Sequence, residues 1–217
     1  MTAYLIDSNI IAQWVLSRYT MDIAASEINL PKEIINSYND RYSGSIKFVD
    51  KVLQSADNKH EFYVYDFNLF EIIKALKDEI RSMYLFKSGV PLSKWGSKGE
   101  HPKVEVNDEF IDLIIQSFNH AQDALFDIKI TLLELPISRT GIDWENYYEL
   151  YSLLMLQIPR LNTQDTMIVS ACLVDDIEFL ITKDSELKTS MGQINEVIGV
   201  NGLHFKTVDP GNASIWK

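Results

Sequence analysis

Three aspartates stand where apolar segments end or a helix begins, and carboxylates in such places can hold a metal ion. Asp7 follows the run Tyr4-Leu-Ile, and Asp184 follows Leu180-Ile-Thr-Lys. Asp165 lies in the first turn of the helix expected after Leu161. Open α/β sheets place their ligands at the carboxyl ends of strands, and Mg²⁺ prefers oxygen ligands. The three acids therefore indicate a metal site.

Each aspartate also has a purely structural interpretation. Asp7 and Asp184 can serve as helix N-caps, because an Asp side chain accepts hydrogen bonds from first-turn amides. Asp165, with Asn162 or Thr163 as its cap, is favoured by the helix dipole by ~0.3 to 1 kcal/mol without any function. Capping alone does not explain why two apolar strands end in the same way. If those strands are neighbours in the sheet, Asp7 and Asp184 converge.

Glu71 is a fourth candidate, in a helix expected from Phe67 to Phe86. It can form a capping box with Asn68 or pair with Lys74, and neither role involves chemistry. The apolar Phe67 and Phe70 nevertheless place Glu71 in a first turn where a partly buried charge needs a partner. A divalent ion would be such a partner.

Four such carboxylates would repel one another, and two divalent cations would balance their charge. A pair of Mg²⁺ or Mn²⁺ ions can activate water on one side of a phosphodiester and stabilise the leaving oxygen on the other. Asn9 can orient Asp7 or cap a helix, and Thr182 adds a hydroxyl at the same sheet edge. The motifs contain no histidine or cysteine, which argues against zinc and against covalent or histidine-based hydrolysis.

Short apolar runs alternate with segments of helical period, a pattern typical of an α/β domain with a mainly parallel sheet. Helices are expected from Phe67, after Val106 and from Asp143, and two or three more between Ile10 and Ser55, separated at Pro31 and Ser43-Gly44. Five strands are expected, at residues 3–7, 62–66, 128–133, 179–182 and 203–208.

Composition limits the class of protein. The 217 residues, 46% of them hydrophobic, are enough for one domain with its own core. The net charge of -11 excludes a generally basic nucleic-acid-binding surface. A single cysteine, Cys172, cannot form an internal disulfide, and neither a signal peptide nor a membrane span is recognisable. We therefore expect a cytoplasmic protein.

One segment, residues 86–104, differs from the rest in carrying four lysines against a single acid. Cationic side chains around an aromatic ring can contact phosphates and stack a base. A solvated loop kept soluble by its lysines is the alternative interpretation. The candidate substrate-binding residues here are Lys87, Lys94, Trp95 and Lys98.

The arrangement resembles the four signature blocks of PIN-domain proteins, in the same order along the chain. The blocks are Tyr4-Leu-Ile-Asp-Ser-Asn9, a strand leading into Asn68-Leu-Phe-Glu71, Asp165-Thr-Met-Ile-Val-Ser-Ala, and Leu180-Ile-Thr-Lys-Asp184. The resemblance implies a three-layer α/β/α fold with a mainly parallel, roughly five-stranded sheet. It makes residues 1–217 one PIN-like domain with helical insertions near 20–60 and 86–105.

The same resemblance implies a metal-dependent endoribonuclease, and many PIN proteins are toxins of toxin–antitoxin pairs. Asp7, Glu71, Asp165 and Asp184 would hold Mg²⁺ or Mn²⁺, supported by Asn9 and Thr182. RNA would be the substrate, and an antitoxin-like protein or a second copy would be a partner. One alternative is a catalytically weak PIN-like module that binds RNA or protein. Another is a haloacid-dehalogenase-type phosphohydrolase with Asp7 as nucleophile, although Asn9 stands where its general acid belongs.

Overall fold

The computed structural model describes residues 2–55, 59–91, 94, 99, 104–126, 129–200 and 202–212. The chain divides into two compact units. Unit 1 comprises Met1–Asp7, Ser55–Asn68 and Ile130–Lys217, and unit 2 comprises Ser8–Gln54 and Leu69–Lys129. Within the described ranges, no helix is both long enough and apolar enough to cross a membrane.

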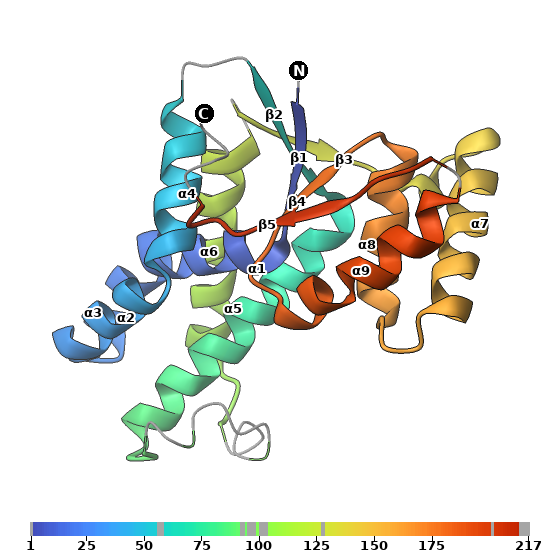
Figure 1. The fold of residues 1–217 in the computed structure, drawn as a ribbon. Helices are drawn as coiled ribbons and strands as arrows, with labels where there is room; N and C mark the ends of the chain where they lie inside the picture. The colour runs from blue at the N-terminus through green and yellow to red at the C-terminus, as the bar shows by residue number, and fades with distance from the viewer. Residues whose placement is uncertain are drawn as a thin grey trace. The chain divides into compact units, whose positions relative to one another are not determined.

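Unit 1 contains a five-stranded sheet in which every pairing is parallel (Figure 1). The strand order is β3-β2-β1-β4-β5. This confirms the α/β fold class with a parallel sheet of five strands. The strands are β1 (Thr2–Ile6), β2 (His60–Tyr65), β3 (Ile130–Leu133), β4 (Phe179–Ile181) and β5 (Lys206–Val208).

The adjacent strands β1 and β4 each have apolar residues at successive positions, as buried parallel strands usually do. Leu5 and Ile6 of β1 are fully buried, and Leu5 stands in register with Tyr63 of β2 and Leu180 of β4. Three helices of the same unit share a core with the sheet, and Leu5, Val169 and Ile194 belong to it. These helices are α7 (Ile142–Gln157), α8 (Thr163–Val174) and α9 (Ser185–Gly199).

Unit 2 is helical. Its core includes Ile10, Val49 and Leu76, all fully buried. Two side-chain hydrogen bonds join its helices: Trp14 Nε1 donates to Asp50 Oδ1 at 2.8 Å, and the Tyr38 hydroxyl donates to Glu79. Its elements are α1 (Ser8–Val15), the π-helix η1 (Leu16–Thr20), α2 (Met21–Glu27), α3 (Lys32–Arg41), α4 (Ser43–Gln54), most of α5 (Asp66–Lys87) and α6 (Asp108–Phe126).

The structure corrects two expectations about the helices. Two or three helices were expected between Ile10 and Ser55, but α1, η1, α2, α3 and α4 occupy that stretch. The helix expected from Phe67 begins at Asp66, whose Oδ1 accepts from the Phe67 amide at 2.7 Å. Asn68 therefore lies inside the helix and is not its cap. Its side chain is fully buried, and neither end of its amide has a hydrogen-bond partner in the described part of the chain.

Candidate metal centre at the strand ends

Asp7 directly follows β1 and is held against the neighbouring strand β4. Its backbone N–H donates to the Ile181 carbonyl at 3.0 Å, and its Oδ2 accepts a hydrogen bond from the Thr182 hydroxyl. Asp7 is 8% exposed and Thr182 is fully buried. A buried carboxylate of this kind needs such donors, because water does not solvate it fully. The supporting role expected of Thr182 thus has a direct geometric counterpart.

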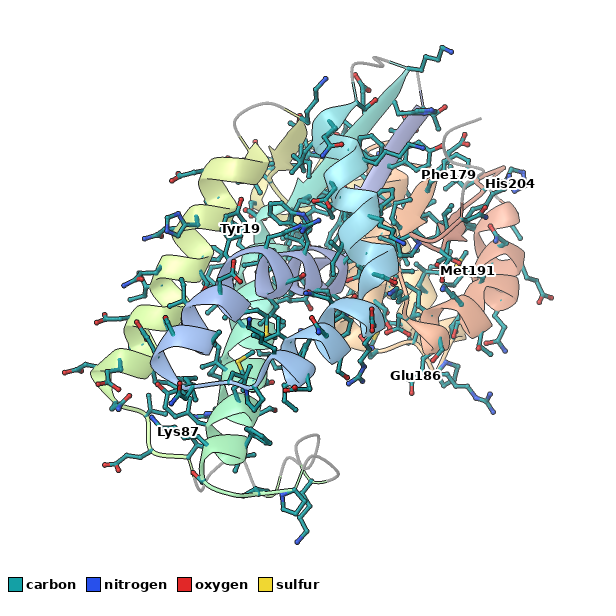
Figure 2. The ribbon with its side chains drawn as sticks, turned by 90° about the vertical axis from the view of Figure 1, so that its left-hand side faces the viewer. Tyr19, Lys87, Phe179, Glu186, Met191 and His204 are labelled. Carbon is teal, nitrogen blue, oxygen red and sulfur yellow. The ribbon has the colours of Figure 1, made fainter. Side chains whose placement is uncertain are left out.

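Asp184 is joined to the same hydroxyl from the other side. Its backbone N–H donates to Thr182 Oγ1 at 2.9 Å, so Thr182 binds both aspartates. Asp184 is also the N-cap of α9: its Oδ1 accepts from the Glu186 and Leu187 amides at 2.7 and 2.9 Å. Glu186, labelled in Figure 2, lies in the first turn of this helix. Asp184 is therefore a helix cap, as one interpretation of the sequence held. The cap uses only one of its two carboxylate oxygens.

Asp165 lies in the first turn of α8, as expected, and Asn162 is the cap. Asn162 Oδ1 accepts from the Asp165 amide at 2.8 Å, while Asn162 Nδ2 donates to Asp165 Oδ2 at 2.7 Å. The reciprocal pair holds this carboxylate in one orientation at the helix N-terminus. The helix dipole there favours its charge.

The sheet order explains why these ends are a suitable place for a ligand. From β1 the chain crosses to β2 and β3 on one side, and later returns to β4 and β5 on the other side of β1. Between β1 and β4 the direction of winding reverses, and open α/β sheets bind ligands at the carboxyl ends of strands at such a point. Asp7 follows one of these two strands, and Thr182 and Asp184 follow the other. We call Asp7, Thr182 and Asp184 the strand-end site.

Glu71 and Asn9 belong to unit 2. Glu71 Oε2 accepts from the Ser8 hydroxyl at 2.7 Å, so Ser8 is a partner that sequence reasoning missed. The only signal for it was the capping character of the triplet Asp7-Ser8-Asn9. Asn9 is exposed in the first turn of α1.

The lysine-rich segment is described only in part. Lys87 ends α5, and its Nζ lies 5.8 Å from the centre of the Tyr84 ring. Lys94 is exposed. Trp95 and Lys98 lie outside the described residues.

The donor chemistry of the acidic residues fits a hard divalent cation. Asp7, Asp165 and Asp184 offer carboxylate oxygens, Thr182 offers a hydroxyl, and no thiol or imidazole belongs to the set. In the described ranges, however, no three His, Cys, Asp or Glu side chains form a group that could hold a metal ion. The described residues thus include suitable metal ligands, but these side chains do not form one coordination shell in this structure.

Comparison of the chain with protein-family models gave no match. Comparisons with curated proteins and with solved structures also gave none.

Proposed function

We propose that this chain is a divalent-metal-dependent endoribonuclease of the PIN-like type, with its centre at the strand-end site and Asp165. The observation that carries the proposal is the junction of β1 and β4. At the winding reversal, Asp7 follows one of two adjacent parallel strands, and Thr182 and Asp184 follow the other. The buried Thr182 hydroxyl bonds to both aspartates.

The residues of the chain would divide the work as follows. Thr182 fixes the Asp7 carboxylate, and Asn162 fixes the Asp165 carboxylate. Asp184 keeps one oxygen in the α9 cap, and its other oxygen takes no part in that cap. When bound, Mg²⁺ or Mn²⁺ would activate the attacking water and stabilise the leaving oxygen of the phosphodiester. Glu71 belongs to unit 2, and the role of its charge is tested separately.

The test is cleavage of end-labelled single-stranded and structured RNA in Mg²⁺ or Mn²⁺. We expect cleavage by the wild type that stops on addition of chelator. Asp7→Asn and Asp165→Asn should each lose roughly 100-fold or more in rate, because losing a ligand charge removes several kcal/mol of transition-state stabilisation. Glu71→Gln keeps an acceptor for Ser8 and therefore tests the charge of Glu71 alone.

Asp123→Asn is the matched control, since Asp123 is an exposed acid on α6. It should cleave like the wild type. Full cleavage by both Asp7→Asn and Asp165→Asn would refute the proposed centre.

A second candidate is a PIN-like module that binds RNA or protein without cutting. The observation favouring it is that protein groups already bond to two of the candidate carboxylates: Ser8 donates to Glu71, and the Glu186 amide donates to Asp184 in the helix cap. Wild-type protein that binds RNA in a gel-shift assay but cuts none in either metal would support this candidate. Growth arrest on expression, relieved by Asp7→Asn, would support a toxin-like role and direct attention to an antitoxin-like partner.

A further inference from the structure

A groove runs along one side of α7 in unit 1. Two cavities, of about 610 and 420 Å³, lie side by side there and share Glu149 and Leu153 in their walls. The first is closed by residues of α9, including Glu196 and Val197, and the second by residues at the end of α8 and in the segment after α9. We call the two cavities together the α7–α9 groove.

Aliphatic and polar side chains both line the groove, and we call four of the aliphatic ones its floor. Leu150 and Leu153 of α7 and Val197 of α9 are only partly buried, and Val200, just after α9, is 87% exposed. Aliphatic surface left in water costs about 25 cal/mol per Å², and clusters of it commonly mark interaction sites. Burying these side chains against a binding partner would therefore lower the free energy.

The rim of the groove carries charge of one sign. Glu149, Glu196 and Asp176 line it, and among the residues that the structure describes no Lys, Arg or His does. None of the three has an ion-pair partner within the described ranges. Unit 1 as a whole contains 16 acidic and 7 basic residues, a net charge of -9, whereas unit 2 contains 15 and 13. The groove thus lies in the unit that carries most of the negative charge.

We propose that the α7–α9 groove binds a cationic amphipathic helix of a partner protein. A helix packs well between two others, and α7, with 16 residues, is ~24 Å long at 1.5 Å per residue. A partner of about four turns would place apolar residues at positions i, i+3 or i+4 and i+7 on the floor. Lysines or arginines on its flanks would then face Glu149, Glu196 and Asp176.

The rim argues against a second copy of this chain as the occupant. A two-fold contact would bring the same patch of each copy together, so acid would face acid. Like charges brought together at an interface cost binding energy. The proposal is independent of nuclease activity.

The test uses a designed, fluorescently labelled 18-residue helix with leucines on one face and lysines on its flanks. Its binding to the full chain is measured by anisotropy, next to a counterpart in which glutamates replace the lysines. We expect the cationic helix to bind at least 10-fold more tightly, because opposite charges at the rim add to apolar burial.

Variants separate the groove from general attraction between opposite charges. Leu153→Arg should weaken binding about 10-fold, whereas Leu156→Arg, on the same helix but 82% exposed and outside the groove, should change it less than about two-fold. The double variant Glu149→Gln/Glu196→Gln should weaken binding more than Glu145→Gln/Glu186→Gln, which removes equal charge from exposed sites on α7 and α9 outside the groove.

Three results would overturn the proposal. The first is equal weakening by the groove and control variants, with folding verified by circular dichroism, since it would leave only non-specific attraction. The second is equal binding of the two peptides. The third is a dimer in sedimentation that Leu153→Arg dissociates, because it would show that a second copy occupies the groove.

Discussion

The Thr182 hydroxyl makes two hydrogen bonds that cannot be predicted from the sequence. It donates to Asp7 and accepts from the Asp184 amide, across a separation of 175 residues in the first case. Because Thr182 is fully buried, water cannot replace either bond. A single hydroxyl thereby fixes the side chain of one aspartate and the backbone of the other.

We expect Thr182→Val, which keeps the shape but removes the hydroxyl, to lower the free energy of unfolding by about 2 to 4 kcal/mol. The estimate combines a hydrogen bond to a charged group with one to a backbone amide. Urea denaturation at pH 7 measures it. Thr182→Ser keeps the hydroxyl and should lose at most about half as much, so equal losses in both variants would show that packing alone matters.

At the scale of elements, Asp184 belongs both to a helix and to the candidate metal centre. Its Oδ1 caps α9, a role that needs an acceptor but no charge. A metal role would need the charge. Substitution can therefore separate the two functions.

We expect Asp184→Asn to retain the cap and change stability by less than about 0.5 kcal/mol, whereas Asp184→Ala should lose about 1 kcal/mol. Thermal unfolding of both variants measures this. If Asp184 is also a ligand, RNA cleavage should fall in both variants alike. An Asp184→Asn protein that cleaves like the wild type would leave Asp184 with the capping role only.

The strands were predictable because buried apolar runs of four to six residues are distinctive, but their ends depend on tertiary contacts. The run 203–208 was expected to be one strand, yet β5 begins at Lys206. Asn195 of α9 explains this: its amide bonds both the N–H and the carbonyl of Phe205, each at 2.9 Å, so that residue is withheld from the sheet. Asn68 was expected as a cap for a different, local reason: Asp66 starts the helix two residues earlier, and its Oδ1 accepts from the Phe67 amide.

The candidate site was predictable in kind but not in assembly. Apolar runs followed by acids marked Asp7 and Asp184. That their two strands are neighbours in the sheet could only be assumed from the sequence. The hydroxyl between them, the Ser8 bond to Glu71 and the Asn162 bond to Asp165 depend on side-chain orientation. No periodicity in a sequence encodes such orientation. Whether the carboxylates share a metal stays a prediction.

Over the whole molecule, several groups that become anionic on losing a proton are buried. In unit 1, burial and nearby Asp175 raise the pKa of the Cys172 thiol well above its usual value, and burial raises the pKa of Tyr147 to about 12. In unit 2, burial and then Glu79 raise the pKa of Tyr42 to about 12. In each case the folded state retains its proton at a pH where the unfolded state releases it.

The resulting pH dependence has a definite sign. A group whose pKa is raised on folding stabilises the fold below its unfolded pKa, and this contribution is lost as pH rises through the folded pKa. Unfolded values are about 8.5 for Cys and 10 for Tyr, so stability should fall above pH ~8.5 and more steeply above ~10. Urea unfolding from pH 7 to 11 measures the decline.

Tyr147→Phe provides the control within the molecule. The Tyr147 hydroxyl is buried and has no hydrogen-bond partner among the described residues, so its removal should not lower stability at pH 7 and should reduce the slope above pH 10. Tyr148→Phe, at a tyrosine that is 59% exposed, should leave the slope unchanged. A stability that is flat up to pH 11 in the wild type would contradict the assignment of these groups.

The interleaving of the two units along the chain also sets the order in which they can form during synthesis. Both segments of unit 2 precede Ile130, whereas β4 begins only at Phe179 and β5 follows it. Until those residues leave the ribosome, β1 lacks the partner on its β4 side, and its open edge can pair with other chains. Closing the β1–β4 pairing requires a contact of very long sequence separation, which slows folding. The same arrangement that brings Asp7 and Thr182 together thus leaves the open edge of β1 exposed to aggregation until β4 has been synthesised.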